Sequence, residues 1–255
     1  MAQSFYLFLN SKDTSFGTSA NFQVDFQKSG IPFSEGEVAI GLDYLIMPNL
    51  IYPIRANRNQ VVFNEGGADK VATIPTGYYD STNFPGVLAA ALNDAGAFTY
   101  TVTISSTTNK ITISAGSAFV LKFTNTSSYM WKILGFDYNS VTASATEHTG
   151  SMPIRLDGDE YFVLQLENLP SENVSSSFTT RGIMDVIPMN GAFGDVIYYT
   201  PNQINNLVLG QLNDLKYIRV HIVDVDGYDI PITDNCEIMI KLRIINTMLP
   251  FSGQF

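Results

Sequence analysis

Residues 217–225 read YIRVHIVDV and alternate between two sets of side chains. One set is Tyr217, Arg219, His221 and Val223, and the other is Ile218, Val220, Ile222 and Asp224. Successive side chains of a β-strand point to opposite faces of its sheet, so this period of two predicts a strand with one face in a core.

A second long strand is predicted at residues 37–47, which read EVAIGLDYLIM and are largely apolar. Pro48 and Pro53 end it, because proline has no backbone N–H to donate to a sheet. The other strands predicted for the same sheets are 5–9, 22–26, 161–166, 184–188, 196–199 and 236–245. Turn-rich segments separate these strands, and this spacing predicts an all-β fold of the antiparallel sandwich type.

The pattern changes between residues 55 and 150, where the predicted strands become shorter and richer in threonine. This block holds the best helix candidate, residues 84–93, with Asn83 as a possible N-cap. A hairpin of residues 98–105 and 110–114 follows, residues 119–123 and 131–136 close the block, and residues 140–150 are a polar loop. Its expected local core is Phe84, Leu88, Leu92, Val102, Ile104, Ile111, Ile113 and Leu121. We therefore expect residues 55–150 to form an inserted β-rich domain with one helix, and residues 1–54 and 151–255 to form the host domain.

Composition excludes several classes of function. The net charge is −10 and no basic run occurs, which argues against general nucleic-acid binding. No run of residues has the length and apolarity of a membrane span or a signal peptide, so the sequence predicts a protein made in a cytoplasm that stays soluble. The single cysteine, Cys236, lies in an apolar stretch and is expected in the core, without a disulfide framework.

Candidate chemical sites are few, and each has a structural interpretation. The two histidines, His148 and His221, lie apart in the sequence and are expected as a solvated loop residue and a residue on a sheet face. No nucleophile elbow, phosphate-binding loop or dinucleotide fingerprint is present. The sequence therefore predicts no enzyme and names no catalytic, cofactor-binding or metal-binding residue.

Two acidic clusters leave a weaker possibility open. The stretch Asp224-Val-Asp226-Gly-Tyr-Asp229 resembles the start of a calcium loop, but its twelfth position is Asn235 and strands flank it. A tight turn fits better, because Asp-Gly supplies the positive φ that such a turn requires. The second cluster is Asp157-Gly-Asp159-Glu160. A weak calcium or subunit-contact role for these acids stays open.

Aromatic residues offer candidate interface anchors. Most of the 13 tyrosines and 17 phenylalanines are expected to fill the core. In the pairs Tyr78-Tyr79 and Tyr198-Tyr199, a period of two sends one ring inward and one outward, and the outward rings could anchor a partner. The sequons at Asn125 and Asn173 are interpreted as chance matches.

The order of the segments resembles the single jelly-roll penton (minor capsid) proteins of virophages, Polinton-like viruses and related large DNA viruses. The resemblance rests on four places in the sequence. Near the N-terminus these are the pair Phe8-Leu-Asn-Ser11 and Val24-Asp-Phe26, and then EVAIGLDYLIMPN at 37–49. The third is IPTGYY at 74–79, followed by residues 88–93, 100–104, 110–113 and 134–136, and the fourth is YIRVHIVDVDGYDIPI at 217–232 with CEIMIKLRI at 236–244. It implies a jelly roll with an inserted domain and a homopentamer at the fivefold vertex of an icosahedral virion assembled in the host cell. Neighbouring major capsid protein would be a partner, and the inserted domain could contact the host surface.

Three functions compete at this point. A capsid protein explains the sandwich pattern, the low content of charged residues (15%) and the missing catalytic motifs. A receptor- or carbohydrate-binding head of a fibre or spike is the alternative, which binding in a glycan array or a trimeric state would favour. An enzyme would require a pocket that the sequence does not indicate. Candidate ring contacts are residues 171–177, 191–194 and 248–255.

Overall fold

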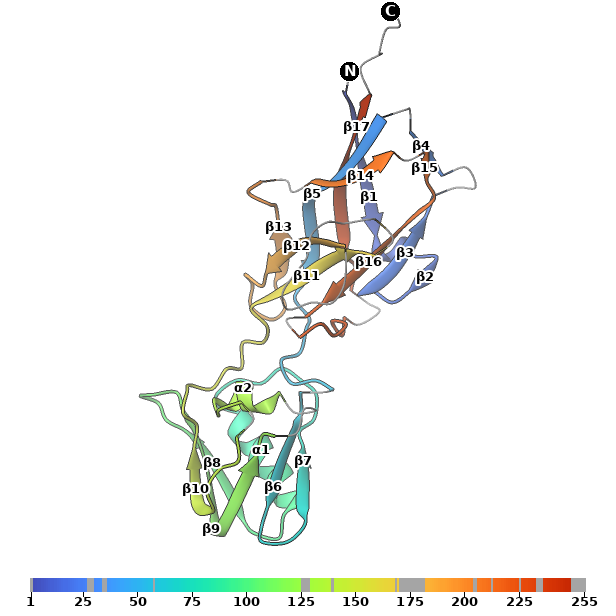
Figure 1. Cartoon of the computed structure of the whole chain (residues 1–255). Helices are drawn as coiled ribbons and strands as arrows, with labels where there is room; N and C mark the ends of the chain where they lie inside the picture. The colour runs from blue at the N-terminus through green and yellow to red at the C-terminus, as the bar shows by residue number, and fades with distance from the viewer. Residues whose placement is uncertain are drawn as a thin grey trace, which may run out of the picture. The chain divides into compact units, whose positions relative to one another are not determined.

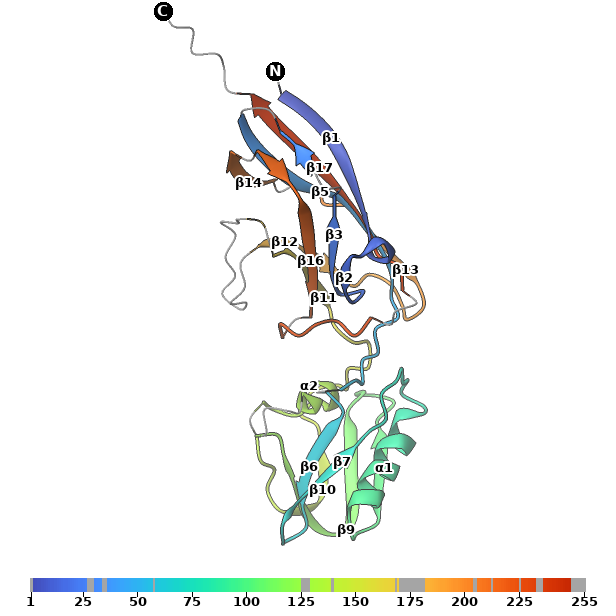
Figure 2. The same ribbon diagram turned by 90° about the vertical axis from the view of Figure 1, so that its right-hand side faces the viewer.

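The structure, a computed structural model, describes the chain except for residues 1, 27–29, 34–35, 57, 125–128, 139, 168, 170–181, 204–205, 212, 225, 233–235 and 249–255. The chain divides into two compact units, which Figures 1 and 2 show in two views. Unit 1 is residues 1–51 and 159–255, and unit 2 is residues 52–158. None of the helices in the described residues is long and apolar enough to span a membrane.

Unit 1 consists of two antiparallel sheets around one core. The first sheet has the order β1 (Ala2–Asn10), β17 (Met239–Met248), β5 (Gly36–Pro48) and β13 (Val196–Tyr199), and β14 (Asn206–Gln211) also pairs with β5. The second has the order β12 (Ile183–Pro188), β11 (Tyr161–Leu166), β16 (Tyr217–Val223), β3 (Asn21–Asp25) and β2 (Phe16–Gly17). A short 3-10 helix (Ser11–Asp13) follows β1, and β4 (Ile31–Pro32) pairs with β15 (Asp214–Leu215).

The strand pairing of unit 1 is nested, and this identifies the jelly roll. The first strand, β1, pairs with the last, β17, and the next strand of the sandwich, β3, pairs with β16. Moving inward along the chain, β5 pairs with β13 and β14, and β11 pairs with β12. A long hairpin rolled up across two sheets has this pairing, so the expected antiparallel jelly roll is confirmed. Unit 2 is inserted between β5 and β11.

The strand β5 shows how the apolar pattern is used. Its large buried side chains are Val38, Ile40, Leu42, Leu45 and Met47. They are two residues apart, except that Leu45 comes three residues after Leu42. The ladder to β17 shifts at this step, which leaves Asp43 as the extra residue of a β-bulge. The bulge returns the apolar residues to the core side of the sheet after the irregular step.

The alternation at residues 217–225 predicted β16 correctly. Ile218, Val220 and Ile222 are fully buried, whereas Tyr217 on the other face is 39% exposed. Cys236 is buried in the same core, as predicted.

Unit 2 has its own sheet and its own core. The strands are β6 (Gln60–Asn64), β7 (Asp69–Thr73), β8 (Tyr100–Ile104), β9 (Ile111–Lys122) and β10 (Ala145–Thr149), and the helices are α1 (Phe84–Ala95) and α2 (Met130–Leu134). The order is β10-β9-β6-β7, and β8 also pairs with the long strand β9. Helix α1 lies along this sheet (Figure 2).

Most of the core predicted for this block is present. Six of its eight residues are buried, and Val102 and Ile104 pack partly buried against them. Three local predictions are wrong. Asn83 does not cap α1, because its side chain accepts a hydrogen bond from the backbone of Asp80. The block was expected to hold one helix, but residues 130–134 form a second, α2, which ends where Gly135 adopts a left-handed conformation.

The third error concerns residues 140–150, which were predicted as a polar loop. They include the strand β10, because residues 145–149 pair with β9. The segment is polar and only His148 is buried, so its sequence shows no apolar alternation that would predict a strand.

The unit boundaries fall at 51–52 and 158–159, whereas the sequence placed them at 54–55 and 150–151. Ile54 and Ile154 explain the difference, because both are buried in the core of unit 2.

We propose that unit 2 can be removed without unfolding unit 1. A chain with residues 52–158 replaced by a Gly/Ser linker is expected to keep β-sheet circular dichroism and a cooperative thermal transition. An unfolded product would mean that the two units depend on each other for folding.

Candidate interaction surface

The structure gives His148 a structural role. Its ring is buried in unit 2, with Nε2 2.9 Å from the carbonyl oxygen of Phe119 and the ring edge-to-face on Phe119 at 4.5 Å between centroids. The prediction of a solvated histidine is wrong, because β10 carries the residue against β9.

His221 lies on the outer face of β16, between two carboxylates. Its Nε2 is 2.6 Å from Asp229 Oδ1, and its Nδ1 is 2.7 Å from Glu167 Oε1, a contact outside hydrogen-bond geometry. Glu167 also pairs with Arg219 at 3.0 Å. The cluster joins β16 to the residue after β11 and to the following loop, and it contains no nucleophile.

The acidic loop after β16 uses its first carboxylate to stabilise a turn. Asp224 is buried, and its Oδ1 accepts hydrogen bonds from the backbone N–H groups of Asp226 (2.9 Å) and Tyr228 (3.0 Å). Gly227 adopts φ +84°, as the turn interpretation requires. In the second cluster Asp157 is exposed and lies 3.7 Å from Arg155 Nε. The described residues contain no group of three or more His, Cys, Asp or Glu that could hold a metal ion.

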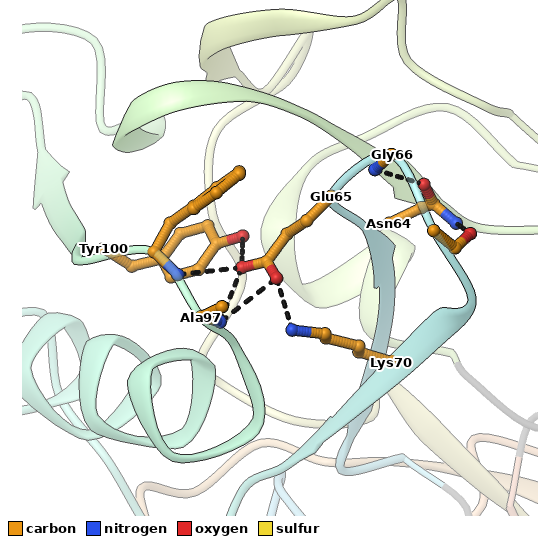
Figure 3. Close-up of polar contacts among 8 residues, drawn as sticks. Asn64, Glu65, Gly66, Lys70, Ala97 and Tyr100 are labelled. Atoms are coloured by element: carbon orange, nitrogen blue, oxygen red, sulfur yellow. Dashed lines mark hydrogen bonds and ion pairs between the residues drawn. The ribbon is translucent and has the colours of Figure 1, made fainter.

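Unit 2 contains a buried carboxylate that the sequence pattern did not reveal, Glu65 in the turn after β6 (Figure 3). Oε1 accepts hydrogen bonds from the backbone of Ala97 (2.9 Å) and Phe98 (3.1 Å) and from the Tyr100 hydroxyl (2.9 Å). Lys70 donates to Oε2. Burial raises the pKa of this carboxyl, but the hydrogen bonds from Lys70, the two backbone groups and Tyr100 outweigh it and bring the pKa to about 2. The cluster fastens the β6–β7 turn to the segment between α1 and β8.

The outer face of the first sheet in unit 1 carries several exposed apolar side chains. Four of its aromatic rings point away from the core: Tyr6 (52% exposed), Phe8 (59%), Tyr44 and Tyr198 (62%). Val196, 66% exposed, extends the face along β13. Together with Lys241 and Arg243 on β17, these residues are called the aromatic face below. Scattered exposed rings are ordinary, but adjacent rings on neighbouring strands are typical of surfaces that a partner covers.

Lys241 occupies the middle of the aromatic face and has an internal partner. Its Nζ is 2.7 Å from Asp43 Oδ2 and 3.9 Å from the centre of the Tyr6 ring. Tyr44 lies on its other side, at 5.4 Å. The bulge on β5 makes this possible, because it turns both Asp43 and Tyr44 toward Lys241. The hydrogen bond to Asp43 raises the pKa of Lys241, so the ammonium is charged.

Arg243 lies two residues after Lys241 on β17 and, unlike Lys241, has no carboxylate partner among the described residues. It lies between Tyr6 and Gly41 across the two flanking ladders. Its Nε is buried and finds no hydrogen-bond acceptor in the described part of the chain. No carboxylate of the described residues forms an ion pair with Arg243, so the aromatic face carries a cation without an anionic partner in that part of the chain.

The tyrosine pairs alternate as the sequence predicted. Tyr198 points outward and contacts Tyr44 at 5.8 Å between ring centres. Tyr199 is half-buried, and burial together with the carboxylate of Asp185 raises its pKa to about 12. In unit 2, Tyr78 is exposed, whereas the Tyr79 hydroxyl donates to Pro75.

The outer face of the second sheet has a different character at its β2–β3–β16 end. Phe16 (68% exposed) pairs with Gln23, and Tyr217 pairs with Asp25. The pKa of Asp25 is lowered by hydrogen bonds from Ser15 and Gln23, so the carboxylate is charged. No described cation forms an ion pair with it. We call Phe16, Gln23, Asp25 and Tyr217 the Asp25 face.

Of the ring contacts predicted from sequence, only residues 191–194 can be placed fully. There the backbone N–H of Gly194 donates to Asn49 at 2.8 Å, and Asn49 donates back to Gly191 at 2.8 Å. Residues 171–177 and 249–255, and the two sequons, lie outside the described residues.

Comparison with known proteins gives a likeness in structure alone. No protein family model and no curated protein matches the chain. Among solved structures, the crystal structure of the selenomethionine-labelled penton protein of mavirus is similar, with a TM-score of 0.50 and 12% sequence identity. The match covers 96% of this chain and 100% of that chain. It extends the likeness from the jelly roll to the inserted unit, because neither unit alone could supply such coverage.

Proposed function

We propose that this protein is a structural capsid protein, the penton subunit that forms homopentamers at the fivefold vertices of an icosahedral virion. One observation carries the proposal: a jelly roll with a unit inserted between β5 and β11 matches the mavirus penton protein over the whole of that chain. The protein would reside in the virion after assembly in the host cell and would contact neighbouring major capsid protein.

The chemistry of the described polar residues supports a structural role. The buried groups His148, Asp224 and Glu65 all bond to backbone groups and fasten turns or strands. A catalytic site needs a nucleophile, a base and an oxyanion donor around a common point, and none of these clusters provides that arrangement. We therefore expect no enzymatic activity.

The proposal is tested by the size of the assembly. Native mass spectrometry of the purified protein, alone and with major capsid protein, is expected to show a species of five subunits, and negative-stain images should show fivefold rings. A trimer as the only higher species would contradict the proposal and favour the head of a fibre or spike.

Host contact through unit 2 is a second, compatible role. Its surface carries an aromatic pair, Trp131 and Tyr138, with ring centres 5.2 Å apart and Tyr138 68% exposed. Rings of this kind stack on sugars or anchor protein partners. Specific binding of the whole protein in a glycan array, lost on Tyr138→Ser, would support this role.

A further inference from the structure

We propose that the aromatic face of one subunit docks on the Asp25 face of a second copy, with Arg243 pairing with the Asp25 carboxylate of its neighbour. The inference rests on the proposed function, because it specifies the contact that would close the ring. The occupant of the aromatic face is thus another molecule of this chain.

Charge complementarity is the first argument. The aromatic face carries Lys241, already neutralised by Asp43, and Arg243, for which the described residues provide no carboxylate. The Asp25 face carries a charged carboxylate whose hydrogen-bond donors, Ser15 and Gln23, are neutral. A buried donor without an acceptor costs free energy, so a contact that supplies a carboxylate is favourable.

Geometry is the second argument. The two sheets enclose the same core, so their outer faces point away from each other. Arg243 and Asp25 of one chain therefore cannot meet, whereas those of two copies can. A contact between two different faces of identical subunits is heterologous, and its repetition generates a ring if the rotation closes.

The apolar residues fit the same contact. Phe16 and Tyr217 flank Asp25 on the neighbouring strands, and Tyr6 and Phe8 lie beside the two cations. Each face thus combines exposed rings with one charge that has no ion-pair partner among the described residues, Arg243 on one face and Asp25 on the other, and these two charges are opposite. Aromatic residues and arginine are the side chains that most often dominate the energy of an interface.

Charge reversal tests the inference. Arg243→Glu or Asp25→Lys alone places like charges opposite each other and is expected to weaken ring assembly by about 10- to 100-fold. The double variant restores opposite charges at every interface and should recover pentamers. Arg155→Glu reverses a partly exposed charge on unit 2, which forms a long ion pair with Asp157, and is the matched control with no expected effect on ring assembly. Circular dichroism and thermal melts verify that each variant is folded.

A mixture of the two single variants gives a sharper result. An Arg243→Glu subunit and an Asp25→Lys subunit place opposite charges together whichever of them comes first around the ring. A ring of five cannot alternate the two variants throughout, so at least one interface joins two identical variants and places like charges together. We expect the equimolar mixture to assemble less well than the double variant. If wild-type pentamers form and the single variants form them equally well, or the double variant fails although folded, this inference is wrong and the proposed function stands. If the wild type forms no pentamer, even with major capsid protein, the proposed function fails first.

Discussion

A chain that lacks Asp43 is expected to fold, whereas a chain that lacks Gly41, two residues earlier, is expected to fail. Leu42 and Tyr44 already pair with consecutive residues of β17, and Asp43 is the extra residue between them. Its removal would turn the bulge into a regular ladder and keep every apolar residue of β5 on its present face. The loss would be the ion pair with Lys241, whose side chain remains partly in contact with solvent.

Deletion of Gly41 has no such solution. If the bulge is lost and the residues before Gly41 keep their pairing with β17, Leu42 turns to solvent and the Asp43 carboxylate enters the core. If the preceding segment shifts instead, Val38 and Ile40 leave the core, where both are fully buried. Exposing a large apolar side chain costs about 1.5–3 kcal/mol, and burying a carboxylate costs several more, so the total approaches the whole stability of a typical domain.

Soluble expression, circular dichroism and thermal melts measure this contrast. The expected result is a small decrease in Tm without Asp43 and an insoluble or unfolded product without Gly41. Equal tolerance of both deletions would show that β5 does not hold the register described above.

Glu65→Gln is expected to cause a large loss of stability in unit 2. The change removes the charge that Lys70 faces, and the amide group brings a donor to a site where the surrounding groups are donors. Unpairing a buried charged group costs roughly 2–4 kcal/mol. Urea denaturation followed by the fluorescence of Trp131, the only tryptophan and a residue of unit 2, measures the effect.

The effect should depend on pH in a defined direction. The folded-state pKa of Glu65, about 2, lies below its ordinary value of 4.5, so the stabilisation is fully present above the ordinary pKa and is lost as pH falls through the folded value. Wild type and Glu65→Gln should therefore differ most near pH 7 and converge toward pH 2. Asp69→Asn is the control, because Asp69 forms an ion pair with Lys122 at an exposed site. A constant difference between pH 7 and pH 3 would contradict this role for Glu65.

Strands and helices that bury one face could be predicted from the sequence, because their apolar residues recur with a regular period. The period of two identified β16, and the spacing of Phe84, Leu88 and Leu92 identified α1, because burial of one face leaves a direct trace in the sequence. The bulge also left a signal in the sequence of β5: its large buried side chains are two residues apart, except for the three-residue step between Leu42 and Leu45.

The features that could not be predicted depend on contacts between distant segments. Glu65 stands in a Glu-Gly-Gly turn, and three of its four donors come from residues 32 to 35 positions later. The aromatic face was hidden for another reason. Residues 5–9 read FYLFL, so the inward Phe5, Leu7 and Leu9 and the outward Tyr6 and Phe8 show no polar contrast. Only the sheet pairing separates these two sets.

The most direct test of the capsid assignment is electron cryo-microscopy of particles assembled from this protein and the major capsid protein of its virus. The proposal predicts that each fivefold vertex carries density for five copies of the jelly roll of unit 1. Vertices built from another protein, or this chain found only in a trimeric fibre, would contradict it.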